Sequence, residues 1–249
     1  MTESSKNNQS SNIRVSVALI THNSARFLRP QIDSILLNLG ADDEIVVSDD
    51  GSTDDTLAIL KSYSNQDPRF RIFTSPTHLG PNGNAEKAYS LCQGEFIFHS
   101  DDDNVWLPGK VDDVLACFQS HPKASLVMHD AAIVSSDLTP ILPSFFKWRH
   151  SKPGILHNVI RSSYGGSMMA FRSSLKRFIL PFPENMPFFF DCWLGFMSDK
   201  HGHSVFLPKV LSDWRRHEGT ASGNPSGSKG KKENRLALRW KIWQFVQKH

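Results

Sequence analysis

Apolar and polar positions alternate in blocks along the first half of the chain. Short runs rich in β-branched and aromatic residues have the character of buried strands; they lie at Val15–Ile20, Glu44–Val47, Arg71–Thr74 and Phe96–Phe98. Between these runs, apolar residues recur at helical spacing, from Phe27 to Leu39, at Leu57 and Leu60, from about Ala85 to Leu91, and from Val111 to Phe118. Strands that alternate with helices predict an α/β fold with a Rossmann-like, mostly parallel sheet and helices on both faces.

Polar residues at the ends of these blocks indicate where helices begin. Asn23 or Ser24 is expected to cap the first helix, and Thr53 the second, because their side chains satisfy free backbone N–H groups. The segment His78–Asn84 contains proline and two glycines and is expected to form a loop. The first half therefore has the pattern of a nucleotide-binding α/β unit, although it lacks both the G-x-G-x-x-G fingerprint and a P-loop.

The two ends of the chain differ from its middle. Residues 1–12 are polar and rich in Ser and Asn, which predicts disorder. Gly219–Lys232 has the composition of a flexible linker, and Arg235–His249 predicts a basic, aromatic C-terminal helix. Such a helix fits an anionic membrane surface or packing against the domain, and both interpretations stay open. The domain itself is assigned to residues 13–222, and the linker with its helix to 223–249.

Composition excludes several classes of protein. A chain of 249 residues is long enough for one large domain. Its net charge of +3 is too small to indicate nucleic acid as a partner. The three cysteines have no metal-binding spacing and suit a reducing compartment. No apolar run approaches the roughly 20 residues that cross a bilayer. We expect a cytoplasmic protein, peripheral on the inner face of the cytoplasmic membrane if the last helix binds there.

The acidic segment after the fourth apolar run is the strongest chemical signal. Asp101, Asp102 and Asp103 follow Phe96–Phe98 almost directly. Adjacent carboxylates repel one another unless a cation compensates them, and an oxygen-rich site without sulfur suits Mg²⁺ or Mn²⁺. Carboxyl ends of strands are also where open α/β sheets bind ligands. A solvated acidic turn is the alternative. His99 follows the strand alternation and is interpreted as a packing residue.

The second half contributes one carboxylate in apolar surroundings. Asp191 stands among aromatic residues in the segment Phe188–Trp193. Such surroundings disfavour the charged form and raise the pKa toward that of a working base. The alternative is a helix N-cap after the proline-containing segment Pro183–Pro187. Gly165 and Gly166 either let the backbone approach a ligand or form an ordinary turn.

Three segments in order resemble family 2 glycosyltransferases, and most closely the bacterial rhamnosyltransferase-like group. They are Val15–Asn23, Glu44–Asp54 and Ser100–Pro108, and the whole resemblance runs roughly from Ile13 to Ser222. It implies the GT-A fold, with a nucleotide-sugar-binding half at 13–120 and an acceptor half at 121–222. It also implies a nucleotide-diphosphate sugar donor, a divalent cation, inversion at the anomeric carbon, and a role in bacterial surface polysaccharide biosynthesis (O-antigen, capsule or lipopolysaccharide).

The resemblance implies roles for individual residues. Nucleotide-sugar binding is expected of Thr21, His22, Asn23, Asp50, Asn84, Asp101 and Asp102. Metal ligation is expected of Asp103, Asp101 and His217. The catalytic base is expected to be Asp191, the diphosphate ligands Arg215 and Arg216, and the lining of the acceptor and sugar pocket Gly165, Gly166, Ser167 and Trp193. The group usually reads Ser-Asp-Gln-Asp-Asp where this chain has Ser100-Asp-Asp-Asp-Asn104, so which of the three acids contact metal and which contact ribose stays open.

Two other functions fit parts of the pattern. A non-catalytic relative that binds a sugar nucleotide is disfavoured because Asp50, Asp103 and Asp191 are all present. A nucleotidyltransferase that makes the sugar nucleotide needs a glycine-rich, basic phosphate loop near the N-terminus, and Ile20–Ser24 is not one. The expected acceptor is a saccharide or a lipid-linked saccharide.

Overall fold

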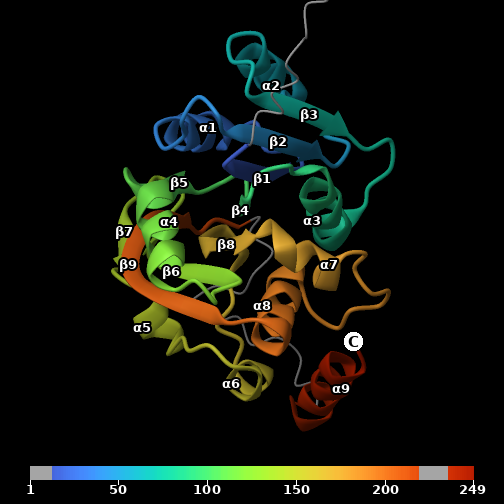
Figure 1. Cartoon of the computed structure of the whole chain (residues 1–249). Coiled ribbons are helices and arrows are strands. Elements are labelled where there is room, and N and C mark those ends of the chain that lie inside the picture. The colour runs from blue at the N-terminus through green and yellow to red at the C-terminus, as the bar shows by residue number, and fades with distance from the viewer. Residues whose placement is uncertain (1–12, 219–234) are drawn as a thin grey trace, which may run out of the picture.

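The computed structural model describes residues 13–218 and 235–249. The predicted disordered N-terminus and the predicted linker lie outside these residues. Within them the strands form one mixed sheet in the order β3-β2-β1-β4-β8-β6-β9-β5, with β7 paired to β6 (Figure 1). The strands are β1 (Val15–Thr21), β2 (Glu44–Asp49), β3 (Phe70–Thr74), β4 (Phe96–Ser100), β5 (Val105–Trp106), β6 (Leu126–Val134), β7 (Pro140–Leu142), β8 (Met169–Arg172) and β9 (Ser204–Arg215).

The helices of the described residues lie around this sheet (Figure 1). They are α1 (Leu28–Leu36), α2 (Thr56–Ser64), α3 (Gly80–Leu91), α4 (Lys110–Ser120), α5 (Phe145–Arg149), α6 (Ile155–Ile160), α7 (Lys176–Ile179), α8 (Phe190–His201) and α9 (Arg235–Lys248), with short 3-10 turns at Gly166–Met168 and Ser173–Leu175. The predicted α/β fold with helices on both faces is confirmed.

The sheet has a parallel part and a mixed part. β1 pairs in parallel with β2 and β4, and β2 pairs in parallel with β3. β8 then runs antiparallel to both β4 and β6, while β9 is parallel to β6 and antiparallel to β5. The direction of the strands therefore changes between β4 and β8, in the middle of the sheet.

Alternate side chains of the central strands feed two separate cores, as the two-residue period of a strand requires. In β1, Val15, Val17 and Leu19 are fully buried under α1, α2 and α4. Ala18 points to the other core, which α3, α7 and α8 cover. Because both faces are covered, the parallel strands are apolar almost throughout.

The first two helices begin later than expected. α1 has Phe27 at its N-cap and α2 has Asp55, and neither cap uses its side chain. The capping predictions for Asn23, Ser24 and Thr53 were wrong. Instead, the Asn23 Oδ1 atom accepts a hydrogen bond from the Thr53 backbone N–H at 2.8 Å. These polar residues tie the loop after β1 to the loop after β2.

α3 begins earlier than expected, at Gly80 rather than near Ala85. Pro81 fits the first turn because a helix leaves its first N–H groups without partners anyway. Most of the predicted loop His78–Asn84 is therefore helical. As a result Asn84 sits on α3, buried, and its Nδ2 donates to the Thr21 carbonyl at 3.2 Å.

The C-terminal helix α9 packs on the domain with one of its sides. Val246 is fully buried, and the Phe245 ring lies 5.6 Å from that of Phe188 and 6.1 Å from that of Trp193. On another side Trp240 is 61% exposed. In Figure 1, α9 lies near α6, at the opposite end of the molecule from α2. None of the helices among the described residues is both long and apolar enough to cross a membrane.

Candidate active site

A cavity of about 800 Å³ opens at the carboxyl ends of β1, β2 and β4 and extends under the loops of the second half. This volume lies within the range of small-molecule sites. The cavity brings together most of the residues predicted for the site, namely Thr21, His22, Asn23, Asp50, Asn84, Asp101, Asp102, Asp103, Gly165, Gly166, Ser167, Asp191, Arg216 and His217. Trp193 and Arg215 are not among its described lining residues.

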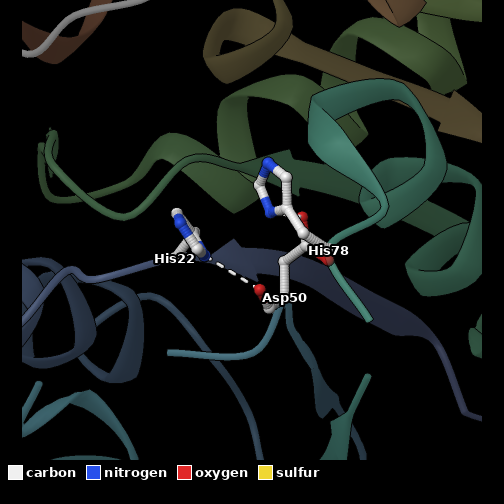
Figure 2. Close-up of side chains that lie close together, drawn as sticks. All are labelled: His22, Asp50 and His78. Atoms are coloured by element: carbon white, nitrogen blue, oxygen red, sulfur yellow. Dashed lines mark hydrogen bonds and ion pairs between the residues drawn. The ribbon is translucent and has the colours of Figure 1, made fainter. Parts of the chain in front are cut away.

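One end of the cavity is built around Asp50, which follows β2. Its Oδ1 accepts the Leu79 N–H at 2.7 Å, and its Oδ2 accepts the Gly80 N–H at 2.9 Å. The His78 Nδ1 lies 2.9 Å from Oδ2, and the His22 Nδ1 contacts the Asp50 carbonyl oxygen at 2.8 Å (Figure 2). Asp50 thus fastens the start of α3 to the edge of the sheet.

The ligand-type atoms of His22, Asp50 and His78 lie within 4.8 Å of one another (Figure 2). Both oxygens of Asp50 already accept hydrogen bonds, so the carboxylate needs no cation to be satisfied. The two imidazole rings, with centroids 4.6 Å apart, are exposed at this end of the cavity. The arrangement offers planar surfaces to a planar ligand. Nothing in the local sequence singled out His78.

The middle of the cavity holds the acidic tip, Asp101–Asp103, at the end of β4. Burial and the neighbouring charge of Asp103 raise the pKa of Asp102 to about 7, although Ser24 Oγ donates a short hydrogen bond to it. Burial also raises the pKa of Asp103, against the lowering effect of His217. The His217 Nε2 lies 3.0 Å from Asp103 Oδ2. The fold therefore concentrates carboxylates here at an electrostatic cost.

The chemistry of this group suits a divalent cation, although its ligand atoms are spread more widely than those of His22, Asp50 and His78, the group of three that lies within 4.8 Å among the described residues. Asp101, Asp103 and His217 offer two carboxylates and an imidazole, a donor set that Mn²⁺ accepts and whose oxygens suit Mg²⁺. The raised carboxyl pKa values show mutual crowding of charge, which a bound cation relieves.

Arg215 supports the acidic tip from behind. Its Nε donates to the Asp103 carbonyl at 2.7 Å, and its backbone N–H donates to Asn104 Oδ1 at 2.9 Å. Its Nη1 donates to the Ser136 carbonyl, and Arg215 is not among the described lining residues of the cavity, which does not favour the role of diphosphate ligand. Arg216, the next residue, lines the cavity. Neighbouring residues of an extended chain face opposite sides, so only one of the two arginines reaches the site.

Asp191 lies on the other side of the cavity, in the first turn of α8. The N-cap of this helix is Phe189, so the alternative of an Asp191 cap was wrong. The Asp191 Oδ1 accepts the backbone N–H of Cys192 at 2.7 Å. Burial among aromatic residues, with a smaller effect of the Asp101 charge, raises the pKa of Asp191 to about 6. A carboxylate with this pKa can accept a proton near neutral pH.

The glycine turn at Gly165–Ser167 lines the same side of the cavity. A Cβ on Gly166 would stand 2.8 Å from the Phe190 ring, so packing against α8 requires this glycine. Trp193 lies deeper than predicted: it is 2% exposed, and its indole N–H donates to the Ile179 carbonyl at 3.0 Å. It is a core residue of α8 and is not among the described lining residues of the cavity.

Sequence reasoning missed several residues that line the cavity. Trp148 and Arg149 of α5, together with Phe189 and Trp214, give the far end an aromatic wall. Trp148 and Arg149 stand in no recognisable motif. Phe189 lies in the segment Phe188–Trp193 and Trp214 directly precedes Arg215, but neither was itself assigned to the site. His99 was interpreted as packing, and it is fully buried, but its Nε2 also lies 3.0 Å from Asp101 Oδ1.

A family profile and several known proteins match parts of this chain. The profile described as Glycosyl transferase family 2 matches residues 16–179. A Campylobacter jejuni GalNAc(5)-diNAcBac-PP-undecaprenol beta-1,3-glucosyltransferase is 34% identical over 41% of this chain and 33% of its own length. An uncharacterised glycosyltransferase of Nostoc is 29% identical over 51% of this chain and 39% of its own length. The chain thus spans two fifths or less of these two relatives.

A third relative matches over most of both chains. It is the Escherichia coli UDP-Glc:alpha-D-GlcNAc-diphosphoundecaprenol beta-1,3-glucosyltransferase, 22% identical over 84% of this chain and 80% of its own length.

Two solved structures share the fold. Staphylococcus aureus TarS 1-349 with UDP-GlcNAc superposes with a TM-score of 0.70 at 20% identity, over 94% of this chain and 65% of that one. The mannosyltransferase of Pyrobaculum calidifontis with GDP-Man and Mn²⁺ gives 0.61 at 18% identity, over 80% and 56%. This likeness confirms the predicted GT-A fold.

Proposed function

The chain belongs to glycosyl transferase family 2, and on that premise we propose that it transfers a sugar from a nucleotide-diphosphate sugar to an acceptor hydroxyl. One observation carries the proposal. A single cavity holds a cluster of crowded carboxylates with His217 on one side and Asp191, a half-buried carboxylate with a raised pKa, on the other. This pair of features is what a displacement at an anomeric carbon requires.

The donor binds along the parallel half of the sheet. His22, Asn23 and Asp50 stand where the base and ribose are expected, with Thr21 and Asn84 behind them. Structures of this fold hold UDP-GlcNAc in the Staphylococcus aureus protein and GDP-Man with Mn²⁺ in the Pyrobaculum calidifontis protein. Both ligands are nucleotide-diphosphate sugars, which supports this class of donor here.

The diphosphate lies over the acidic tip. Asp103, Asp101 and His217 are the residues that would hold Mn²⁺ or Mg²⁺, and such an ion compensates the charge of a diphosphate leaving group. Arg216 adds a positive charge to the same cavity and is within the described lining. Asp102 is left to the ribose or to the hydrogen bond from Ser24.

Asp191 is the base of the reaction. Its carboxylate takes the proton of the acceptor hydroxyl while the hydroxyl oxygen bonds to the anomeric carbon and the bond to the diphosphate oxygen breaks. Base and leaving group stand on opposite sides of the sugar, so the configuration inverts. A pKa of about 6 leaves Asp191 ionised and ready to accept a proton at neutral pH.

The acceptor is a saccharide, and we favour a lipid-linked one. Trp148, Phe189 and Trp214 line the far end of the cavity, and aromatic faces pack well against the apolar faces of sugar rings. The Campylobacter jejuni and Escherichia coli relatives are named for acceptors linked to undecaprenol diphosphate. This supports a role in bacterial surface polysaccharide biosynthesis.

The surface formed by α6 and α9 suits an anionic membrane. α6 exposes Leu156 and Ile160, and α9 exposes Trp240. Residues 235–249 contain four lysines and arginines and no acid. Basic and aromatic residues together favour the interface of an anionic leaflet. These features support a peripheral position on the inner face of the cytoplasmic membrane.

The test is a donor screen. We would measure melting temperature and turnover with UDP-Glc, UDP-GlcNAc and GDP-Man, each with and without Mn²⁺, and read the anomeric configuration of the product by NMR. The proposal expects one donor to stabilise the protein in the presence of Mn²⁺ and to be consumed with inversion. Donor binding without transfer to any saccharide acceptor would indicate a non-catalytic relative. Release of pyrophosphate from a nucleoside triphosphate would indicate a nucleotidyltransferase.

A further inference from the structure

A buried imidazole connects the acidic tip to the core. His99 lies in β4 and has no exposed surface. Its Nε2 is 3.0 Å from Asp101 Oδ1, and its Nδ1 is 2.9 Å from the hydroxyl of Tyr89, a residue of α3 that is also fully buried. The three side chains form a continuous hydrogen-bonded chain from α3 to the acidic tip.

The Asp101 carboxylate fixes which atom donates at one end of this series of hydrogen bonds. A carboxylate only accepts hydrogen bonds, so the Nε2 atom that faces Asp101 must carry a proton. The Tyr89 hydroxyl supplies the partner at Nδ1, so both ring nitrogens of His99 are occupied. With both nitrogens bound, the ring has a single orientation. Asp101, which is partly exposed, has its Oδ1 held from the buried side.

His99 also contacts the other two parts of the site. Its ring centroid lies 4.5 Å from that of Phe190, the residue before Asp191. A Cβ on Gly166 would stand 3.1 Å from its Cδ2. His99 is therefore in contact with the acidic tip, the glycine turn and the start of α8 at once. A merely apolar ring would fill the same space but would offer nothing to Asp101.

We propose that His99, oriented by Tyr89, is a positioning residue that holds the Asp101 carboxylate in the orientation that cation binding requires. This inference rests on the proposed function, because it takes Asp101 to contact the divalent cation. Hydrogen bonds to the ligands of a metal orient them, and losing such a bond typically weakens metal binding about 10- to 100-fold. His99 itself touches neither cation nor substrate.

The test measures binding of Mn²⁺ alone, from the EPR signal of the unbound ion, in three variants of the full chain. His99→Phe keeps an aromatic ring but removes the donor to Asp101. His99→Gln keeps an N–H donor close to the Nε2 position. Tyr89→Phe removes only the hydroxyl. We expect the dissociation constant for Mn²⁺ to rise about 10- to 100-fold in His99→Phe, to stay near that of the wild type in His99→Gln, and to rise by a smaller factor in Tyr89→Phe.

Melting temperatures separate positioning from packing. If His99→Phe is folded and binds Mn²⁺ as the wild type does, the proposal is wrong. If His99→Gln and His99→Phe weaken Mn²⁺ binding equally, the donor is irrelevant and the proposal is again overturned. If His99→Phe does not fold, Tyr89→Phe provides the test. An unchanged affinity of Tyr89→Phe for Mn²⁺ would then overturn the proposal. Wild-type protein that binds no Mn²⁺ would overturn it together with the proposed metal dependence. Absence of sugar transfer with the expected Mn²⁺ pattern would contradict only the proposed function.

Discussion

Single carboxylates carry the chemistry of this site, and each is held partly away from water. For Asp191 we predict that Asp191→Asn lowers turnover by on the order of 10²- to 10⁴-fold, because the amide keeps the shape but cannot take the proton. Donor affinity, measured by calorimetric titration, should change little. Near-normal turnover in this variant would move the base to another residue.

The raised pKa of Asp191 predicts the pH dependence of the proposed reaction. The carboxylate must be ionised to act as a base, and its pKa is about 6. Turnover under saturating substrates should therefore fall as the pH drops below about 6 and level off above it. The residual activity of Asp191→Asn should lack this acidic limb. A limb of unchanged position in that variant would assign it to another group.

Asp103 is the acid with the clearest prediction for the cation. Asp103→Ala should abolish the dependence of donor binding on Mn²⁺ and leave the fold intact, since the side chain lies at the cavity and not in a core cluster. Asp101→Ala should weaken Mn²⁺ binding at least as much as His99→Phe, because it removes the whole carboxylate that His99 is proposed to position. Asp113→Ala is the matched control, because that acid forms an ion pair with Lys209 and is not among the described lining residues of the cavity. Calorimetric titration of UDP with and without Mn²⁺ measures the effect.

Lys110 gives a prediction for stability against pH. Its Nζ is buried, donates to the Ser167 carbonyl at 3.1 Å and lies 4.0 Å from the Trp106 ring centroid. Burial holds the pKa of Lys110 well below its ordinary value of 10.5. Between these two pKa values the unfolded chain binds more protons than the folded protein, so the free energy of unfolding rises with pH until about 10.5. Denaturant titrations should show that rise in the wild type and a flatter profile in Lys110→Met.

Residue types were predictable from the sequence where chemistry alone selects them. A run of acids after a buried strand and one acid among aromatics pointed to Asp101–Asp103 and Asp191, and all four line the cavity. Arg215 and Trp193 were assigned to the wrong side of their elements. The side on which a residue lies depends on the pairing of β9 with β5 and on the packing of α8, which distant segments decide.

Helices and strands were predicted where hydrophobic periodicity is strong. Apart from the two-residue strand β5, the first half was predicted correctly in type and order, because each helix there buries one apolar stripe against a strand that is itself apolar. Helix starts were less predictable. Asn23 and Thr53 have the residue types of helix N-caps, but they form a hydrogen bond to each other between two loops. The capping preference, which is local in sequence, was therefore overridden by a tertiary contact.

α8 depends on a glycine in its interior. A Cβ on Gly195 would stand 2.2–2.3 Å from ring atoms of Tyr164. Alanine favours a helix by roughly 1 kcal/mol over glycine, but overpacking a rigid core costs about 1–3 kcal/mol or more. We therefore predict that Gly195→Ala lowers the free energy of unfolding, as measured by urea denaturation.

α9 has a packed side and an exposed side, and a pair of variants separates them. Val246→Ala should lower the free energy of unfolding by about 2 kcal/mol, from two buried methyl groups and the cavity left behind, with vesicle binding unchanged. Trp240→Ala should leave stability unchanged and weaken sedimentation with phosphatidylglycerol vesicles. Vesicles of phosphatidylcholine serve as the neutral control. Equal vesicle binding by Trp240→Ala and the wild type would contradict the membrane surface.

At the scale of the whole molecule, the cavity lies where the parallel and mixed parts of the sheet meet. The strand order places β4 between β1 and β8, so the acidic tip at the end of β4 faces segments from both halves. This junction was only partly visible in the sequence. The parallel half is predictable from its alternation of apolar strands and amphipathic helices. In the other half, β5 and β8 are too short, and β9 is too mixed in polarity, to be predicted from the sequence alone.

The contact between the acidic tip and the end of β9 has a consequence for the order in which a newly made chain matures. Asp103 and His217 lie 3.0 Å apart in space and 114 residues apart in sequence. A ribosome that adds about 5–20 residues per second needs roughly 6 to 23 s to pass from one to the other. During that interval the emerging protein contains the acidic tip but neither His217 nor Arg215, which bonds to the Asp103 carbonyl. A nascent or truncated chain that ends before β9 therefore lacks His217, one of the three proposed cation ligands, and we expect such a chain not to bind a nucleotide sugar in a Mn²⁺-dependent way.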